Sequence, residues 1–153
     1  MKTVSLFSCG VSSAVATKIL LNEIDEIIYT HINDQHLDTM RFLKDCSNWF
    51  GKEIKIISSD IKSVEEACFA AGGKGYINGP TGAACTRLLK KKVRIDWEKS
   101  QKENIRFVWG LDSTETLRIN RILETMPNNQ HVFPLADKNI CKLQAHEIVL
   151  AVV

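Results

Sequence analysis

The chain has 153 residues, of which 44% are hydrophobic and 25% are charged, the size and balance of one globular domain. A formal net charge of +2 is far from the strong basic bias of a dedicated nucleic-acid binder, so nucleic acid is not an expected partner. No apolar run approaches the roughly 20 residues that span a bilayer, and five cysteines without a CxxC pair favour reduced thiols. We therefore expect residues 1–153 to form one cytoplasmic domain without a membrane partner.

Strand-like and helix-like apolar patterns alternate along the chain, which is typical of βαβ units and a parallel sheet. The expected strands are 4–7, 27–32, 54–57 and 106–109, with a last short strand or extended segment over 131–135. The expected helices are about 12–21, 36–50, 61–71, 86–99, 114–126 and 142–150. These elements predict a three-layer α/β fold, with a parallel sheet of about five strands and helices on both faces.

A glycine-rich segment separates the third and fourth expected helices. Five of the eight glycines lie between Gly72 and Gly82, together with Pro80, and this composition does not favour a regular element. We expect a mobile loop here. The helix that follows should turn Leu89, Val93 and Trp97 towards the core and leave its basic residues on the other side.

The first strand-to-helix turn carries the first candidate site. In an open parallel sheet, ligands bind beyond the carboxyl ends of the strands. The turn consists of small and hydroxyl-bearing residues that let backbone N–H groups approach an anion at a helix terminus, which indicates a phosphate site. Its residues are Ser8, Cys9, Gly10, Val11, Ser12 and Ser13. The alternative is that a serine only caps the helix and the glycine only relieves a tight turn.

The segment from Phe7 to Val15 resembles the SGGxDS pyrophosphate-binding loop of the PP-loop ATP pyrophosphatases, the adenine nucleotide alpha hydrolase-like superfamily. Within it, the segment looks most like the branch of phosphoadenosine phosphosulfate (PAPS) reductases and their small phage-type relatives. The resemblance implies that this loop wraps the β,γ-phosphates of ATP or the corresponding phosphate of an adenylyl sulfate. Cys9 stands where the family usually has glycine, and Ser12 replaces the usual aspartate that would contact a metal.

Two further segments resemble the family in the same order along the chain. Asp34 closes the second strand, where the resemblance implies contact with adenosine; the alternative is an Asx turn. Cys85 begins a segment that looks like the family's cysteine followed by arginine and lysine on a helix. There Arg87, Lys90 and Arg94 would form a basic stripe for phosphates, or for a phosphate and a sulfate. A solvated charged helix face is the alternative.

A later segment, from Trp109 to Arg121, looks like the family's GxRxxES motif with its following arginines. The resemblance implies that Gly110 lets the backbone approach the nucleotide, that Glu115 orients a basic group, and that Arg118 or Arg121 meets phosphate. Asp112 stands where the family often has arginine. The alternative is an ordinary helix start with surface arginines. Residues 133–137 and 142–150 resemble the Pro-Leu segment and last helix of the family core, so the resemblance covers nearly the whole chain.

The resemblance implies ATP, or PAPS, as the nucleotide, with Mg²⁺ as its companion ion. ATP would be cleaved between the α and β phosphates to AMP and pyrophosphate, with adenylation of an unknown acceptor, while Arg87, Lys90 and Arg118 offset charge on oxygens. One alternative is PAPS reductase-like sulfonucleotide reduction that uses Cys85 or an external thioredoxin-like thiol, because the family's carboxyl-terminal redox cysteine is missing. Another is nucleotide binding or sequestration without turnover, which Ser12 favours.

The cysteines and histidines leave further alternatives open. Cys9 lies near a helix terminus and Cys85 near basic residues, and both environments can activate a thiol, although packing explains either position equally simply. The four histidines show no metal-ligand spacing, so no protein-borne metal site is predicted. A homo-oligomer is compatible with the sequence.

Overall fold

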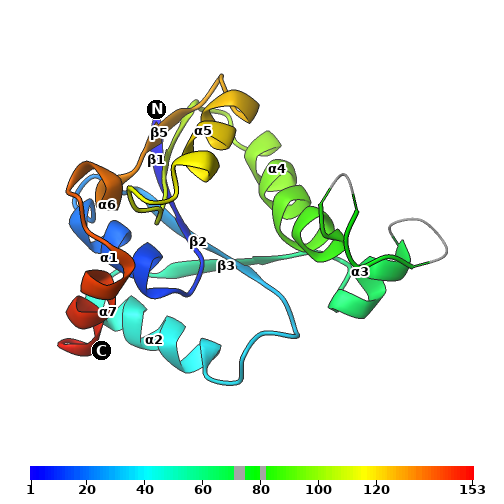
Figure 1. Ribbon diagram of the computed structural model, residues 1–153, viewed down its shortest axis with the longest axis horizontal. Helices are drawn as coiled ribbons and strands as arrows, with labels where there is room; N and C mark the ends of the chain where they lie inside the picture. The colour runs from blue at the N-terminus through cyan, green and yellow to red at the C-terminus, as the bar shows by residue number, and fades with distance from the viewer. Residues whose placement is uncertain (71–74, 80–81) are drawn as a thin grey trace. The chain divides into compact units, whose positions relative to one another are not determined.

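The computed structural model describes residues 1–70, 75–79 and 82–153, and it contains one five-stranded parallel sheet (Figure 1). The strands are β1 (Lys2–Phe7), β2 (Glu26–His31), β3 (Ile54–Ser58), β4 (Ile105–Val108) and β5 (Gln130–Val132). Their order is β3-β2-β1-β4-β5, and β1 pairs in parallel with both β2 and β4. The predicted α/β fold class with a parallel sheet of about five strands is therefore confirmed.

The predicted helices occur in the predicted order, and most of them start at a shifted residue. They are α1 (Val11–Ile19), α2 (Thr39–Phe50), α3 (Val64–Ala70), the π-helix η1 (Thr86–Lys91), α4 (Lys92–Lys99), α5 (Thr116–Thr125), α6 (Pro134–Asp137) and α7 (Lys142–Leu150). The prediction of strand or extended chain up to residue 135 was wrong at its end, because Pro134 occupies the first turn of α6, where its missing N–H costs nothing. Within the described residues, none of the helices is long and apolar enough to cross a membrane.

The chain forms two compact units. The first unit comprises residues 1–29, 38–55 and 103–153, and the second comprises residues 30–37 and 56–102. Within the first unit, α1 connects β1 to β2 and α5 connects β4 to β5, so the two connections progress in opposite directions along the sheet. Because parallel crossovers are right-handed, α1 and α5 cover opposite faces of the sheet, as three layers require.

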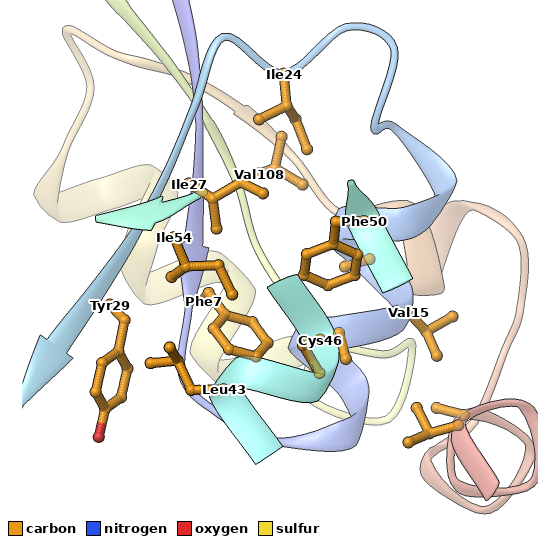
Figure 2. Close-up of a cluster of buried hydrophobic side chains, with 14 of the residues drawn as sticks. Phe7, Val15, Ile24, Ile27, Tyr29, Leu43, Cys46, Phe50, Ile54 and Val108 are labelled. Atoms are coloured by element: carbon orange, nitrogen blue, oxygen red, sulfur yellow. The ribbon is translucent and has the colours of Figure 1, made fainter. Parts of the chain in front are cut away.

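The core of the first unit lies between the sheet and the helices α1, α2 and α7. Figure 2 shows side chains from β1, β2 and β4 meeting those of α1 and α2. Phe7 and Phe50 meet edge to face, with ring centroids 5.9 Å apart, which is a favoured aromatic geometry. On α2 the buried residues are Leu43, Cys46 and Phe50, whereas Leu37, within the predicted helix range 36–50, precedes the observed helix and is 98% exposed.

The second unit has its own small core around α3 and η1. Its buried members are Ile32, Ala67 and Leu89. Leu89, Val93 and Trp97 are all buried, which confirms the predicted apolar side of this helix. The predicted mobile loop over 72–82 includes residues 72–74 and 80–81, which lie outside the described residues. Residues 75–79 form no helix or strand, in agreement with the composition.

Candidate functional site

The first unit contains the point at which the strand order reverses. The chain passes from β1 to β2 on one side, whereas β4 pairs with the other side of β1. The loop after β1 and the loop after β4 therefore both begin at the carboxyl edge of the sheet, on adjacent strands. In open parallel sheets this position forms the ligand-binding crevice. Ser8–Ser13 and residues 109–115 are the two loops at this place.

The loop after β1 closes around the hydroxyl of Ser13. Its Oγ accepts hydrogen bonds from the N–H of Ser8 at 3.1 Å, from the hydroxyl of Ser8 at 3.0 Å and from the N–H of Gly10 at 3.3 Å. It donates to the carbonyl of Gly10 at 2.8 Å. Ser13 is buried, so its hydroxyl shapes the loop from within, and the N–H groups of Ser8 and Gly10 are already used.

The start of α1 offers the remaining donors. The first hydrogen bond of the helix runs from the N–H of Ala14 to the carbonyl of Gly10 at 3.0 Å, so the N–H groups of Val11, Ser12 and Ser13 precede the intrahelical ladder. That of Ser13 is buried, which leaves Val11 and Ser12 as the donors. Such N–H groups, together with the helix dipole, favour an anion. Ser8 is exposed at the same loop and adds a hydroxyl.

Cys9 occupies an unusual backbone conformation in this loop. Its φ is 60°, in the left-handed region that favours glycine. The thiol donates to the carbonyl of Thr39 at 3.4 Å, and burial raises the pKa of Cys9 to about 11. The thiol is therefore neutral near pH 7, which favours the packing role for Cys9 over a nucleophilic one.

Gly110 brings the second loop against the first. A Cβ atom at Gly110 would lie 2.5 Å from both Cα and N of Ser13 and 2.9 Å from the carbonyl carbon of Ser12. These distances are shorter than any ordinary contact between heavy atoms. Glycine at this position therefore lets the end of β4 touch the first turn of α1, and so positions the two loops side by side.

The turn after Gly110 is built around Asp112. Its Oδ1 accepts hydrogen bonds from the N–H of Thr114 at 2.9 Å and from the hydroxyl of Thr114 at 2.5 Å. These bonds lower the pKa of Asp112, and burial opposes them only in part. The sequence predicts Thr114 as the first residue of a helix, but α5 starts at Thr116 because Thr114 belongs to this turn. An aspartate two residues before a threonine at a helix start is a recognisable Asx-turn signal.

The predicted site residues Glu115, Arg118 and Arg121 follow this turn, Glu115 just before α5 and the two arginines within it. One carboxylate oxygen of Glu115 accepts from Arg118, and the other accepts from the N–H of Asp112 at 3.4 Å. Arg118 is 70% exposed and Arg121 is also exposed. The structure therefore places Gly110, Glu115, Arg118 and Arg121 in the same unit as the Ser8–Ser13 loop.

The other predicted residues belong to the second unit. Asp34 accepts a hydrogen bond from the N–H of Val64 at 2.6 Å and thereby caps the start of α3. Cys85 immediately precedes η1, while Arg87 and Lys90 lie within it. Arg94 pairs with Glu98 at 2.6 Å, so it does not continue the predicted basic stripe as an unpaired cation.

The small residues of the loop at 8–13 and the first N–H groups of α1 suit a nucleotide phosphate. The same loop offers few ligands for a metal ion bound directly by the protein. Ser12 provides a hydroxyl where the resembling motif has an acid, and the described residues contain no group of three or more His, Cys, Asp or Glu side chains placed to hold a metal ion. Mg²⁺ is commonly bound through substrate phosphates and few protein ligands. Compared with known proteins, the chain matches no family model and no curated sequence.

Proposed function

We propose that this protein is an adenine-nucleotide-binding protein of the PP-loop type that cleaves ATP between the α and β phosphates. The observation that carries the proposal is the contact at Gly110, which joins the first turn of α1 to the loop after β4 at the reversal point of the sheet. The left-handed conformation of Cys9 adds support, because the resembling motif has glycine at that position.

In the proposed complex, the phosphates meet the N–H groups of Val11 and Ser12, and the exposed hydroxyl of Ser8 turns away from Ser13, to which it donates in the structure, and donates to a phosphate instead. The role of Ser13 is to hold the loop in shape, since its hydroxyl already has partners on both sides of the turn. Arg118 and Arg121 supply the positive charge within the same unit. The proposal therefore uses fewer of the predicted residues than the resemblance implies, and it leaves Asp34, Cys85, Arg87 and Lys90 aside.

The proposed reaction forms one bond and breaks one. An oxygen of the acceptor attacks the α-phosphorus, the bond from that phosphorus to the bridging oxygen breaks, and pyrophosphate leaves with the electron pair. The acceptor proton passes to solvent, and water as the acceptor yields AMP. Helix N–H groups and guanidinium groups stabilise the negative charge that grows on the leaving oxygens. A cytoplasmic location belongs to this proposal, because ATP is abundant there.

Nucleotide binding without turnover is the second candidate. Ser12 lacks the carboxylate of the resembling motif, and the described residues contain no group of three or more His, Cys, Asp or Glu side chains that could hold a metal ion in its place. A protein of this kind would hold the phosphates through the same N–H groups and release them unchanged.

The test is to incubate the full chain with labelled ATP and Mg²⁺ and to measure both nucleotide binding and pyrophosphate release. We expect Arg118→Ala to weaken ATP binding about tenfold, as expected for the loss of a charged hydrogen bond. Arg106→Ala is the matched control, because Arg106 pairs with Glu23 at 2.9 Å near the amino-terminal end of β4. It should change the affinity less than twofold.

Three outcomes separate the candidates. Pyrophosphate release that Ser13→Ala abolishes supports the enzyme, whereas tight binding of ATP without products supports the non-catalytic protein. Sulfite release from PAPS in the presence of thioredoxin would instead establish a reductase. No binding of ATP or PAPS would refute the proposal.

A further inference from the structure

Asn78 is the only asparagine of the chain that is followed by a glycine. Both residues belong to the second unit, in the segment 75–79, which forms no helix or strand. Asn78 is exposed and Gly79 is half-buried, so water reaches the side chain of the first and its junction with the second. The pair therefore lies where the backbone is not held in a regular hydrogen-bond ladder.

The side-chain amide of Asn78 lies against the backbone nitrogen of Gly79. The N–H of Gly79 donates to the Oδ1 of Asn78 at 3.0 Å. This amide forms no other hydrogen bond with the residues that the structure describes, so none of them holds it away from that nitrogen. Oδ1 is bonded to Cγ, and a bond between Cγ and the next backbone nitrogen closes a cyclic imide. The two atoms that would react are thus already brought together.

Glycine at position 79 leaves the approach to Cγ open. It carries no side chain, and it reaches backbone conformations that other residues avoid. The folded segment nevertheless has room for alanine, because a Cβ at Gly79 would lie 3.5 Å from Cε2 and 3.6 Å from Cδ2 of Tyr76, which are ordinary contacts. The φ of Gly79 also lies outside the left-handed region. Gly79→Ala therefore removes the open approach without straining the fold.

We propose that Asn78 is a site of spontaneous deamidation, with the backbone nitrogen of Gly79 as the nucleophile and water as the co-reactant. The nitrogen of Gly79 bonds to Cγ of Asn78, the bond from Cγ to Nδ2 breaks, and the amide proton of Gly79 leaves with Nδ2 as ammonia. Water then opens the cyclic imide. Opening at Cγ gives aspartate, and opening at the backbone carbonyl gives isoaspartate, whose main chain runs through Cγ. Nothing is oxidised or reduced.

The two products should act differently on a pair of nested backbone hydrogen bonds around the site. The N–H of Ala84 donates to the carbonyl of Ile77 at 3.2 Å, and the N–H of Gly82 donates to the carbonyl of Gly79 at 2.8 Å. One residue separates the two bonds on each arm, and on the first arm this residue is Asn78. Aspartate adds a negative charge but keeps the length of the arm. Isoaspartate adds a backbone carbon to that arm alone, so the two bonds can no longer form together.

The first experiment incubates the full chain at mildly alkaline pH and follows its asparagines by peptide mass spectrometry. A protease that cleaves before aspartate but not before isoaspartate separates the two products. We expect Asn78 to be lost about tenfold faster than Asn120, which is also exposed but lies within α5, where the following N–H belongs to a helical hydrogen bond. Gly79→Ala should slow the loss of Asn78 about tenfold.

The second experiment measures amide hydrogen exchange in the isoaspartate fraction of the incubated chain. The N–H groups of Gly82 and Ala84 should exchange about fivefold faster there than in the parent chain, because the turn opens more often. Asn78→Asp is the matched control, since it carries the new charge on a main chain of normal length. Both N–H groups should exchange in this variant as they do in the parent.

Each outcome decides part of the proposal. Equal rates of loss at Asn78 and Asn120 would overturn the site, and an unchanged rate in Gly79→Ala would overturn the role of the glycine. Exchange no faster in the isoaspartate fraction than in Asn78→Asp would refute the effect of chain length. All of these measurements concern the second unit, so their results do not depend on whether ATP binds at the loop of residues 8–13.

Discussion

Replacing Gly110 with alanine tests the contact on which the candidate site in the first unit depends. The added Cβ would lie 2.5 Å from two backbone atoms of Ser13 and 2.9 Å from one of Ser12. Carbon atoms normally approach to about 3.5–4.0 Å, so either β4 or the first turn of α1 has to move by about 1 Å. The clash cannot be relieved by the rotation of a flexible side chain, because the obstructing atoms belong to the backbone.

We expect Gly110→Ala to lower the free energy of unfolding by about 2 kcal/mol, the middle of the range for inserting a methyl group into a packed site. For a domain of this length, that corresponds to a decrease in Tm of about 4–8 °C. Calorimetry or thermal circular dichroism measures the change. Because the two loops would separate, the affinity for ATP should fall as well.

Gly10→Ala is the matched control, because Gly10 lies in the loop after β1. A Cβ at Gly10 would lie 3.5 Å from the Oγ of Ser8, an ordinary contact, and the φ of −117° suits any residue. Alanine is a poorer helix cap than glycine, which destabilises the variant, but it also reduces the entropy of the unfolded chain, which stabilises it. Because these two effects nearly cancel, the free energy of unfolding of Gly10→Ala should stay within about 1 kcal/mol of that of the parent protein. If Gly110→Ala melts no lower than Gly10→Ala, the reasoning about the close approach is wrong.

Three further perturbations test the interior of the first unit. Thr17→Val should lower the free energy of unfolding in urea by about 1–3 kcal/mol, because the buried hydroxyl of Ser5 loses the Thr17 hydroxyl, its partner at 2.6 Å. Adding Ser5→Ala should recover part of this loss. If the effects of the two substitutions on the free energy of unfolding simply add, the two hydroxyls are not coupled. Thr114→Val should raise the pKa of Asp112, because the hydroxyl of Thr114 helps to lower it in the parent protein. The loss of unfolding free energy in the variant should therefore be largest near pH 7 and should shrink as the pH falls through the acid range, where Asp112 becomes protonated. A loss that does not change with pH would show that the carboxylate of Asp112 does not contribute to it. Iodoacetamide at pH 8 should leave Cys9 unmodified in the native protein and label it after unfolding in urea, because burial raises the pKa of its thiol to about 11; rapid native labelling, read by mass spectrometry, would reject that environment.

The helix starts show where local sequence reasoning reaches its limit. Lys142–Leu150 was predicted with both ends correct, because a local pattern of apolar residues and a preceding polar segment define that helix. The helix predicted from residue 61 instead starts at Val64, whose N–H bonds to the carboxylate of Asp34. That partner lies 30 residues earlier in the chain, so no local window contains the information.

The candidate site also combines features that can be predicted from the sequence with features that depend on how the chain folds. The small residues of the loop at 8–13 and the basic residues of the later helices are visible in the sequence, and they direct attention to phosphate. The burial of the Ser13 hydroxyl among the loop's own donors is not visible there, because it depends on how the backbone turns at Cys9. In the part of the chain that the structure describes, Arg94 pairs with Glu98 whereas Arg87 and Lys90 have no ion-pair partner, and this difference likewise depends on which carboxylates come within reach.

The amino-acid sequence by itself determined the alternation of strands and helices, and with it the parallel α/β class, because apolar periodicity and turn residues act over a few neighbouring positions. Only the tertiary structure decided that β4 pairs with β1, about a hundred residues away, and that Gly110 consequently touches the first turn of α1. Strand pairing depends on the burial of whole faces against distant partners, so the geometry of the site emerges only when the chain has folded.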